Sequence, residues 1–255
     1  MTALLSVRGL VKRFGGILVS DNIDFDVRPG EIHALIGPNG AGKTTFINLL
    51  SGELRPNGGR ISFEGHDITE LPTRKRALLG LVRSYQITSV FPELTALQNI
   101  MLAVQGRSTR TYEFLRAVSS DRQLTSPAHT ILDELGLGHS KEVKVSEMAY
   151  GQRRQLELAM VLAMQPKLML LDEPLAGMSG AEADAMVAFL GHVRERCSVV
   201  LIEHDMDAVF SLADRVTVLV YGKPIASGTP EEIQQNDTVR SIYLGDETID
   251  DFAIA

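Results

Sequence analysis

Short apolar runs dominate the first third of the chain. Their period-two alternation, or their continuous apolar character, predicts β-strands at residues 5–10, 17–27 and 31–36. The pairs Gly15-Gly16 and Pro29-Gly30 separate these runs, and both pairs are typical of turns. The chain is therefore expected to begin with strands.

Helical spacing begins after the third strand. A helix is predicted from about Lys43 to Leu50, with Gly52 as its C-terminal stop. Further apolar runs of strand length follow at residues 168–171, 199–202 and 215–220. Strands that alternate with helices predict a largely parallel sheet covered by helices, and thus an α/β fold.

The pattern changes between residues 87 and 148. Strand signals are absent, and apolar residues recur at helical spacing, as at Leu97, Ile100, Met101 and Val104. This stretch is predicted to be a helical insert. Residues 230–255 are predicted to be a C-terminal tail with a helix near residues 237–243.

Composition narrows the class of protein. Apolar residues make up 44 % of the 255, as in ordinary globular proteins, and no run reaches the ~18 residues that a membrane-spanning helix needs. The first residues lack the features of a signal peptide, so we expect a cytoplasmic protein. The net charge of −7 and the absence of a long Lys/Arg run disfavour nucleic-acid binding. The single cysteine, Cys197, fits a reducing compartment and precedes a predicted buried strand, which favours a structural thiol.

A phosphate-binding loop follows the third strand. Gly37-Pro38-Asn39-Gly40-Ala41-Gly42-Lys43-Thr44 matches G-x-x-x-x-G-K-[ST] at every fixed position, and Thr45 extends the expected nucleotide-binding set. Glycines let successive N–H groups point inward at an anion, and the start of the following helix adds positive potential. Lys43 is expected to reach the β- and γ-phosphates, and the Thr44 hydroxyl to bind Mg²⁺. The alternative, an ordinary glycine turn before a helix, does not require the complete motif.

Two carboxylates end the apolar strand at residues 168–171. We expect this strand to lie beside the strand of the phosphate loop. Asp172 would then hold Mg²⁺, and Glu173 would act as general base on the attacking water. The alternative is a solvent-facing acidic loop. His204 follows the strand at 199–202 and should emerge at the same sheet edge, where it is either a γ-phosphate contact or a structural histidine.

The segment Met148-Ala149-Tyr150-Gly151-Gln152 lies twenty residues before Asp172 and is followed by a strongly helical stretch. It resembles the signature of ABC ATPases, and the resemblance extends over nearly the whole chain. It implies a P-loop NTPase (RecA-like) core with an N-terminal antiparallel β-subdomain and an α-helical insert. The implied domains are a core at residues 1–86 and 149–229, a helical subdomain at 87–148 and a tail at 230–255.

The resemblance also implies roles for single residues. Phe14 matches the aromatic residue that stacks on adenine, Gln86 the glutamine that senses Mg²⁺ and water, and His204 the switch histidine. ABC signatures close over ATP held by a second protomer, which implies that ATP and Mg²⁺ are bound by a dimer. Residues Ala149, Tyr150, Gly151 and Gln152 would then contact the partner's nucleotide.

Two positions depart from the family pattern. Ala149 lacks the usual serine hydroxyl, whose hydrogen bond to a charged phosphate is worth about 1.5–3 kcal/mol, so the Gly151 N–H must carry more of the contact. The loop at residues 175–179 lacks the aspartate common there, which puts cross-dimer communication through it in doubt.

The Ala-Tyr-Gly-Gln signature is similar to that of branched-chain amino acid importer ATPases. That resemblance implies a second ATPase subunit, forming a heterodimer in the cell or a homodimer in isolation. It also implies two membrane permease subunits at the inner membrane and, indirectly, a substrate-binding protein. Residues 87–95 would meet the permease, although Phe91 and Leu94 could instead fill the core of the insert. A lipid or lipopolysaccharide exporter ATPase, and a soluble ABC ATPase of the iron–sulfur assembly type, remain alternatives.

Overall fold

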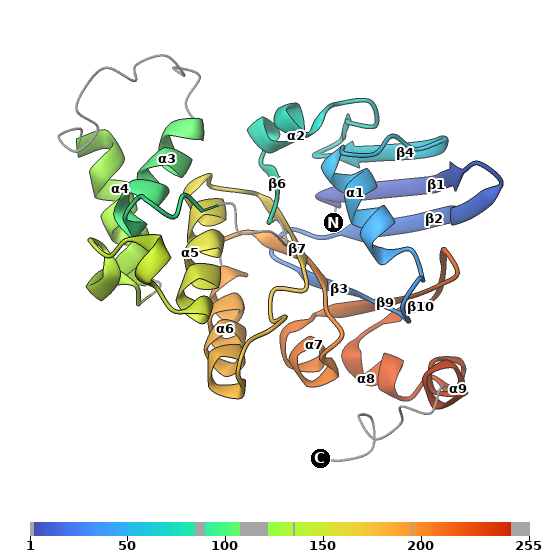
Figure 1. Ribbon diagram of the computed structural model, residues 1–255. Helices are drawn as coiled ribbons and strands as arrows, with labels where there is room; N and C mark the ends of the chain where they lie inside the picture. Colours follow the sequence, from blue (N-terminus) through green and yellow to red (C-terminus); the bar gives the residue numbers. More distant parts are fainter. Residues whose placement is uncertain (1–2, 85–89, 108–121, 135, 195, 246–255) are drawn as a thin grey trace.

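The molecule contains two sheets and a group of helices to one side of them (Figure 1). The computed structural model describes residues 3–84, 90–107, 122–134, 136–194 and 196–245. The buried layers form where the apolar faces of helices and strands pack together. These faces are visible in the sequence as periodic or continuous apolar positions.

The larger sheet has six strands in the order β10-β9-β3-β8-β7-β6. Five of them run parallel, and β10 is antiparallel to β9. Their bounds are β3 Ile32–Ile36, β6 Leu81–Arg83, β7 Leu168–Asp172, β8 Ser198–Ile202, β9 Arg215–Val220 and β10 Lys223–Gly228. All residues of β3, β7 and β8 are buried, as continuous apolar runs predict for a parallel sheet covered on both faces. This outcome confirms the predicted α/β class.

Strand β8 lies between β3 and β7. The expectation that the strand ending in Asp172 lies directly beside the phosphate-loop strand is therefore wrong. Strand order depends on the crossover connections rather than on sequence order, and three fully buried five-residue strands give no local signal of which is central. The carboxyl ends of β3, β8 and β7 still lie at the same edge of the sheet, because the three strands run parallel.

The second sheet is antiparallel, with the order β2-β1-β4-β5. Its strands are β1 Leu5–Phe14, β2 Ile17–Val27, β4 Gly58–Phe63 and β5 His66–Asp67. Helix α1 (Lys43–Ser51) packs between the two sheets, in a core shared by both. It ends as predicted at Gly52, whose φ of 83° favours glycine and whose N–H donates to the Leu49 carbonyl.

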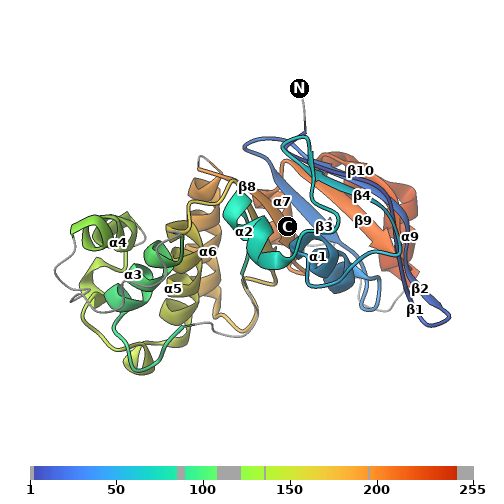
Figure 2. The same ribbon diagram turned by 90° about the horizontal axis from the view of Figure 1, so that it is seen from above.

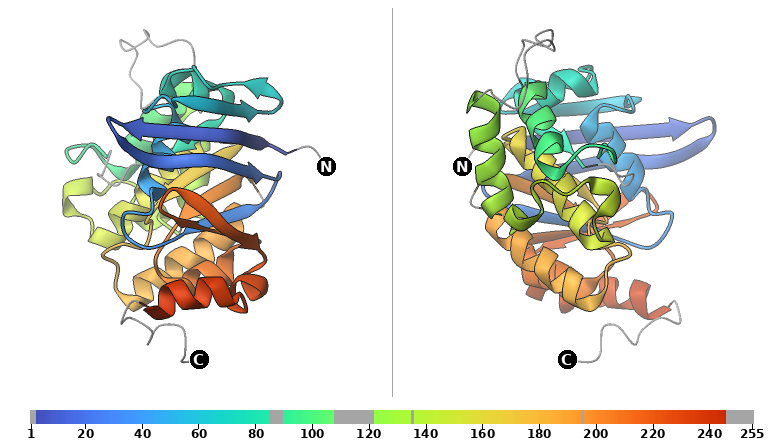
Figure 3. Two further views of the ribbon diagram at one scale, coloured as in Figure 1. Left: turned by 90° about the vertical axis from the view of Figure 1, so that its right-hand side faces the viewer. Right: turned by 60° about the vertical axis from the view of Figure 1, so that its left-hand side comes forward.

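The remaining helices lie around the large sheet and in the helical region on the left of Figure 1. They are α2 Thr73–Leu79, α3 Ala96–Arg107, α4 Arg122–Glu134, α5 Tyr150–Ala163, α6 Gly180–Val193 and α7 Met206–Leu212. Two 3₁₀ turns, η2 Gly138–Ser140 and η3 Val145–Glu147, connect α4 to α5. A separate apolar core joins α3 and α4 to the inner face of α5, and the right-hand view of Figure 3 brings this layer forward.

The C-terminal helices α8 (Pro230–Gln234) and α9 (Asp237–Gly245) lie at the end of the molecule opposite β4 (Figure 3, left). Helix α9 confirms the helix expected near residues 237–243. The strands β4, β5, β6 and β10 have no counterpart among the predicted elements. All four lie at or next to a sheet edge and are short or polar, so their periodicity is weak.

Cys197 is buried, as expected, and burial raises the pKa of its thiol to about 12. The thiol is therefore protonated at neutral pH and unreactive. In the parts of the chain that the structure describes, every helix is too short or too polar to span a bilayer.

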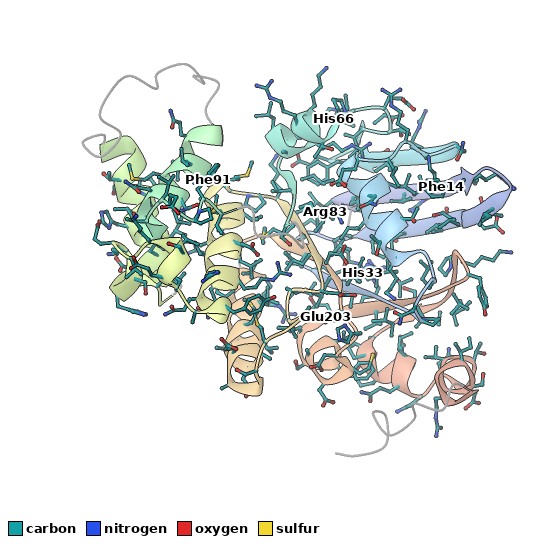
Figure 4. The ribbon with its side chains drawn as sticks, viewed as in Figure 1. Phe14, His33, His66, Arg83, Phe91 and Glu203 are labelled. Atoms are coloured by element: carbon teal, nitrogen blue, oxygen red, sulfur yellow. The ribbon has the colours of Figure 1, made fainter. Side chains whose placement is uncertain are left out.

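His33 is a buried polar residue at the second position of β3 (Figure 4). Its ring stacks on Phe25 at 4.1 Å between centroids, its Nδ1 lies 2.8 Å from the Asp26 carbonyl and its Nε2 lies 2.7 Å from the Thr217 hydroxyl. Burial, reinforced by the nearby Arg215 guanidinium, lowers the pKa of His33 to about 3. The imidazole is thus neutral throughout the physiological range.

This shift predicts an acid-sensitive fold. The unfolded chain takes up a proton at His33 below pH 6.5, whereas the folded chain does so only near pH 3. The free energy of unfolding should therefore fall by about 1.4 kcal/mol per pH unit within that window because of this residue. Urea denaturation of wild type and His33→Gln between pH 7 and 4 should show a steeper fall for the wild type. Parallel curves for the two proteins would contradict the prediction.

Candidate functional site

The phosphate loop connects β3 to α1 and depends on glycine at defined positions. Gly40 and Gly42 have φ values of 78° and 101°, which side chains rarely adopt. A Cβ at Gly37 would lie 2.1 Å from the Leu219 carbonyl oxygen, so only glycine fits there against β9. Gly42 is the N-cap of α1, and no side chain caps that end. The loop is therefore shaped by backbone alone, with the helix start directed into it.

Lys43 lies at the first position of α1 and curls back over the loop. Its Nζ donates to the carbonyls of Gly37 at 2.6 Å and Pro38 at 3.1 Å. Burial lowers the pKa of Lys43, while the charges of Glu173 and Asp172 oppose the shift. The lysine and both carboxylates therefore share one electrostatic environment, even though they come from segments far apart in the sequence.

Asp172 ends β7 and is almost fully buried. Its Oδ2 pairs with Arg83 Nη2 at 3.1 Å, and the side chains of both residues are less than a tenth exposed. Burial raises the pKa of Asp172, and Arg83 counteracts this effect. Arg83 also contacts Asn48 of α1 and Glu53 (3.1 Å), so one guanidinium connects the end of β6 (Figure 4) with α1 and β7.

Glu173 follows directly and has an unusual backbone. Its φ is 48°, in the left-handed region that a non-glycine residue occupies at a cost. The Glu173 N–H donates to the Ile202 carbonyl at 2.8 Å, and the Glu173 carbonyl accepts from Arg154 Nη2 at 3.2 Å. Both polar groups of this residue's backbone are thus held by neighbouring elements.

The edge residues after β8 complete this end of the sheet. Glu203 is buried and accepts the N–H groups of Leu175 (2.8 Å) and His204 (3.1 Å). Burial raises the pKa of Glu203, and these hydrogen bonds oppose the shift. His204 leaves the same edge as Glu173 with its side chain 72 % exposed, as the sheet-edge argument predicts. It is therefore open to a ligand rather than held in a core.

The signature residues form the start of α5, with Ala149 as N-cap. Alanine offers no side-chain acceptor, and Gln152 Oε1 instead accepts the Ala149 N–H at 3.3 Å. The Gly151 N–H donates to Glu182 Oε1 on α6 at 3.1 Å, and the Tyr150 hydroxyl donates to the Ala176 carbonyl at 3.1 Å. Figures 1 and 2 place α5 on the helical side and α1 on the other side of the molecule, so one chain does not bring the signature to its own phosphate loop.

The other expected site residues differ in how far the structure describes them. Phe14, at the end of β1, is 46 % exposed with Lys12 Nζ 5.1 Å from its ring centroid (Figure 4). Thr44 is exposed and Thr45 half-buried in the first turn of α1. Gln86 lies outside the described residues. Phe14 is therefore a partly exposed ring with Lys12 over one face, and Thr44 is an exposed residue.

The oxygen donors at this edge suit Mg²⁺, which takes few protein ligands and keeps water and phosphate oxygens around it. Thr44 supplies a hydroxyl and Asp172 a carboxylate. Within the described ranges no group of three or more His, Cys, Asp or Glu residues could hold a metal without other ligands. The two oxygen donors therefore fit a Mg²⁺ ion that arrives with a nucleotide.

An apolar groove opens between the helical region and the sheet. It has a volume of about 450 Å³. Its lining includes Ala77, Val82, Phe91, Leu102, Met160 and Met164, with Arg83 at the same wall. Phe91 is 52 % exposed and belongs to no described core cluster, which favours a surface role over a core role for this residue.

Four side chains of this region were not among the predicted site residues. Arg83, Arg154, Glu182 and Glu203 each contact a predicted site residue or its loop. Arg154 directly follows the signature and Glu203 precedes His204, so proximity in sequence was an available signal for those two. Arg83 and Glu182 contact residues that are distant in the sequence, and motif spacing does not predict such contacts.

Comparison with known proteins gives a consistent result. Residues 20–176 match the family model described as ABC transporter, and residues 223–248 match the model described as branched-chain amino acid ATP-binding cassette transporter. The chain is 39 % identical over 250 residues to the high-affinity branched-chain amino acid transport ATP-binding protein LivG of Escherichia coli K12. That alignment covers 95 % of the chain and 98 % of LivG. BraF of Pseudomonas aeruginosa, with the same description, is 38 % identical over 252 residues, with 95 % and 98 % covered.

A solved structure agrees in fold. The crystal structure of the ADP conformation of an ATP-binding cassette of an ABC transporter superposes with a TM-score of 0.85 at 29 % identity, covering 96 % of the chain and all of that structure. The shared fold therefore extends over nearly the entire length of both molecules.

Proposed function

The chain belongs to the ABC transporter family of ATP-binding cassettes, and from that membership we propose that it powers an importer of branched-chain amino acids or a related small solute. One observation supports the proposal most directly. Lys43 of the phosphate loop shares its electrostatic environment with Asp172 and Glu173 at the open edge of the sheet. ATP hydrolysis requires a cation that binds phosphate and carboxylates that hold the metal and activate water, and all three groups lie at one edge of the sheet.

ATP binding would use the loop and β1. Backbone N–H groups of the loop at residues 39–45 surround the phosphates, Lys43 exchanges its bonds to loop carbonyls for bonds to the β- and γ-phosphates, and Phe14 stacks on adenine. The Phe14 ring is partly exposed, and stacking would use the face opposite Lys12.

Hydrolysis would use the carboxylates. Thr44 and Asp172 would hold Mg²⁺, which when bound neutralises phosphate charge. Glu173 accepts the proton of the attacking water, and His204 approaches the γ-phosphate from the neighbouring strand. Arg83 keeps the buried Asp172 carboxylate oriented along the edge. Gln86 is proposed to contribute here as well.

A complete site requires two chains. The signature residues 149–152 lie at the start of α5, away from the phosphate loop of the same chain (Figures 1 and 2). We propose that they close over the partner's ATP, with the Gly151 N–H donating to phosphate in the absence of a serine hydroxyl at position 149. That donation requires the Gly151 N–H to leave Glu182.

The cargo and the partners follow from the branch of the family. The match at residues 223–248 and the descriptions of LivG and BraF support branched-chain amino acids as cargo. We propose that the groove beside Phe91 receives a permease subunit, which would hold the cassette at the cytoplasmic face of the inner membrane. A second, related ATPase would complete the dimer, and a substrate-binding protein would deliver the solute.

The intact complex provides the test. Reconstituted with its permeases and its solute receptor in vesicles, it should hydrolyse ATP faster when leucine is added to the receptor side. Lys43→Met should lower ATP affinity by about 10-fold or more, since a hydrogen bond to a charged group is worth about 1.5–3 kcal/mol. Stimulation by lipid but not by amino acids would favour an exporter. Failure to recover any permease with the chain would favour a soluble ATPase.

A further inference from the structure

The orientation of the Glu173 side chain depends on a strained peptide. The left-handed φ of 48° aims the side chain in a direction that ordinary strand geometry would not give. Such a conformation persists only when its surroundings hold it. The Ile202 carbonyl accepts the Glu173 N–H from β8, and the Glu173 carbonyl accepts from Arg154 Nη2 on α5 and from the Ala176 N–H of the following turn, at 3.2 Å each.

Arg154 makes this contact from a buried position. Its guanidinium is forked, with Nη1 donating to Glu157 Oε2 at 2.8 Å and Nη2 donating to the Glu173 carbonyl at 3.2 Å. The side chains of Arg154 and Glu157 are both less than a tenth exposed. A planar guanidinium held on one side by a buried carboxylate has little freedom, so its second arm is a fixed donor.

Two further contacts join the start of α5 to the loop after Glu173. The Tyr150 hydroxyl binds the Ala176 carbonyl, and the Gly151 N–H binds Glu182, whose other oxygen accepts from Ser179. Three successive points of residues 173–182 are therefore attached to the first five residues of α5. A displacement of the signature would be transmitted to this loop.

We propose that Arg154 is a positioning residue that sets the Glu173 peptide according to the position of α5. The inference rests on the proposed function, in which the start of α5 binds the partner's ATP while Glu173 acts in the chain's own site. In a dimer, Arg154 then connects the two ATP sites within a single chain. Binding of ATP at one site aligns the general base at the other.

The test compares the same substitution at neighbouring arginines. Arg154→Lys keeps a cation beside the buried Glu157, but a single ammonium on a flexible stem cannot hold both partners. Arg153→Lys is the matched control, because Arg153 binds the carbonyls of Met148 and Ser146 and does not reach Glu173. Turnover per folded chain should fall about 10- to 100-fold in Arg154→Lys and stay within about threefold in Arg153→Lys, with ATP affinity and melting temperature little changed in both.

Crystal structures of the two variants provide a readout that does not depend on ATPase activity. In Arg154→Lys the Glu173 peptide should rotate out of the left-handed region, and in Arg153→Lys it should not. A wild-type Glu173 conformation together with wild-type turnover in Arg154→Lys would overturn the proposal. If the wild-type chain fails to bind ATP at all, the proposed function fails instead. An equal loss of affinity, turnover and melting temperature would assign Arg154 a purely structural role.

Discussion

Replacing Glu173 with glutamine is expected to lower ATP turnover by about 10²- to 10⁴-fold while leaving ATP affinity close to that of the wild type. Glutamine has the same shape but cannot accept the proton of the attacking water. The Glu173 N–H and carbonyl, which hold its peptide, are backbone groups and remain in place. Nucleotide binding depends on the phosphate loop, which this substitution does not touch.

The same variant should accumulate a closed dimer. ATP holds two chains together only until it is hydrolysed, so slow hydrolysis lengthens the life of the dimer. Size-exclusion chromatography with ATP and Mg²⁺ should show a dimer for Glu173→Gln and mainly monomer for the wild type. Near-wild-type turnover in Glu173→Gln would remove Glu173 from the role of general base.

Glu64→Gln is a suitable control for that experiment. Glu64 also has a left-handed backbone, with φ of 50°, and forms an exposed pair with Lys167 at 2.7 Å. The substitution is again glutamate to glutamine, and Glu64 lies away from the sheet edge that carries Glu173. Its turnover should remain at the wild-type level, since exposed ion pairs contribute about 0–1 kcal/mol to stability. A comparable loss in Glu64→Gln would point to a general effect of losing a carboxylate.

The parts of the fold that the sequence predicts are those with strong local signals. The buried strands β7 and β8 contain continuous apolar runs, and each is followed by residues that act at a sheet edge, as Asp172 and His204 show. The glycine loop before Lys43 has a fixed pattern because backbone geometry allows only glycine there. At these positions a local requirement, burial for the strands and backbone geometry for the loop, limits the residue types and also fixes the structure.

The parts that escaped prediction depend on contacts between distant segments. The three-residue strand β6 exists because Gly80 and Lys167 bring it beside β7, and its own sequence is too short to show a period. The position of β8 between β3 and β7 follows from crossover connections. Arg83 and Arg154 bind partners on other elements, and an arginine in a sequence does not show which carbonyl or carboxylate it will reach.

Arg76 is another arginine whose partners on other elements cannot be read from the sequence. Its replacement is expected to have the largest effect on stability. It lies on α2, is only 1 % exposed and is the largest fully buried side chain among the described residues. Its guanidinium donates to the carbonyls of Leu49 (2.8 Å), Leu50 (2.7 Å), Thr69 (2.9 Å) and Leu71 (2.8 Å). Burial lowers the pKa of Arg76 to about 10, a shift that the nearby Glu70 opposes. A cation thus caps the C-terminal end of α1, where the helix dipole favours positive charge.

Arg76→Met should therefore lower the free energy of unfolding by about 3–5 kcal/mol, because it leaves buried carbonyls without donors at the end of the helix that carries the phosphate loop. Arg74→Met is the matched control on the same helix, since Arg74 is exposed, and it should change stability by less than about 0.5 kcal/mol. Urea denaturation of both variants measures the difference. A loss below about 1 kcal/mol in Arg76→Met would mean that methionine packing or water replaces the four hydrogen bonds. The expected larger loss would instead mean that α1, and with it the loop at its N-terminal end, is held in place by a side chain from α2.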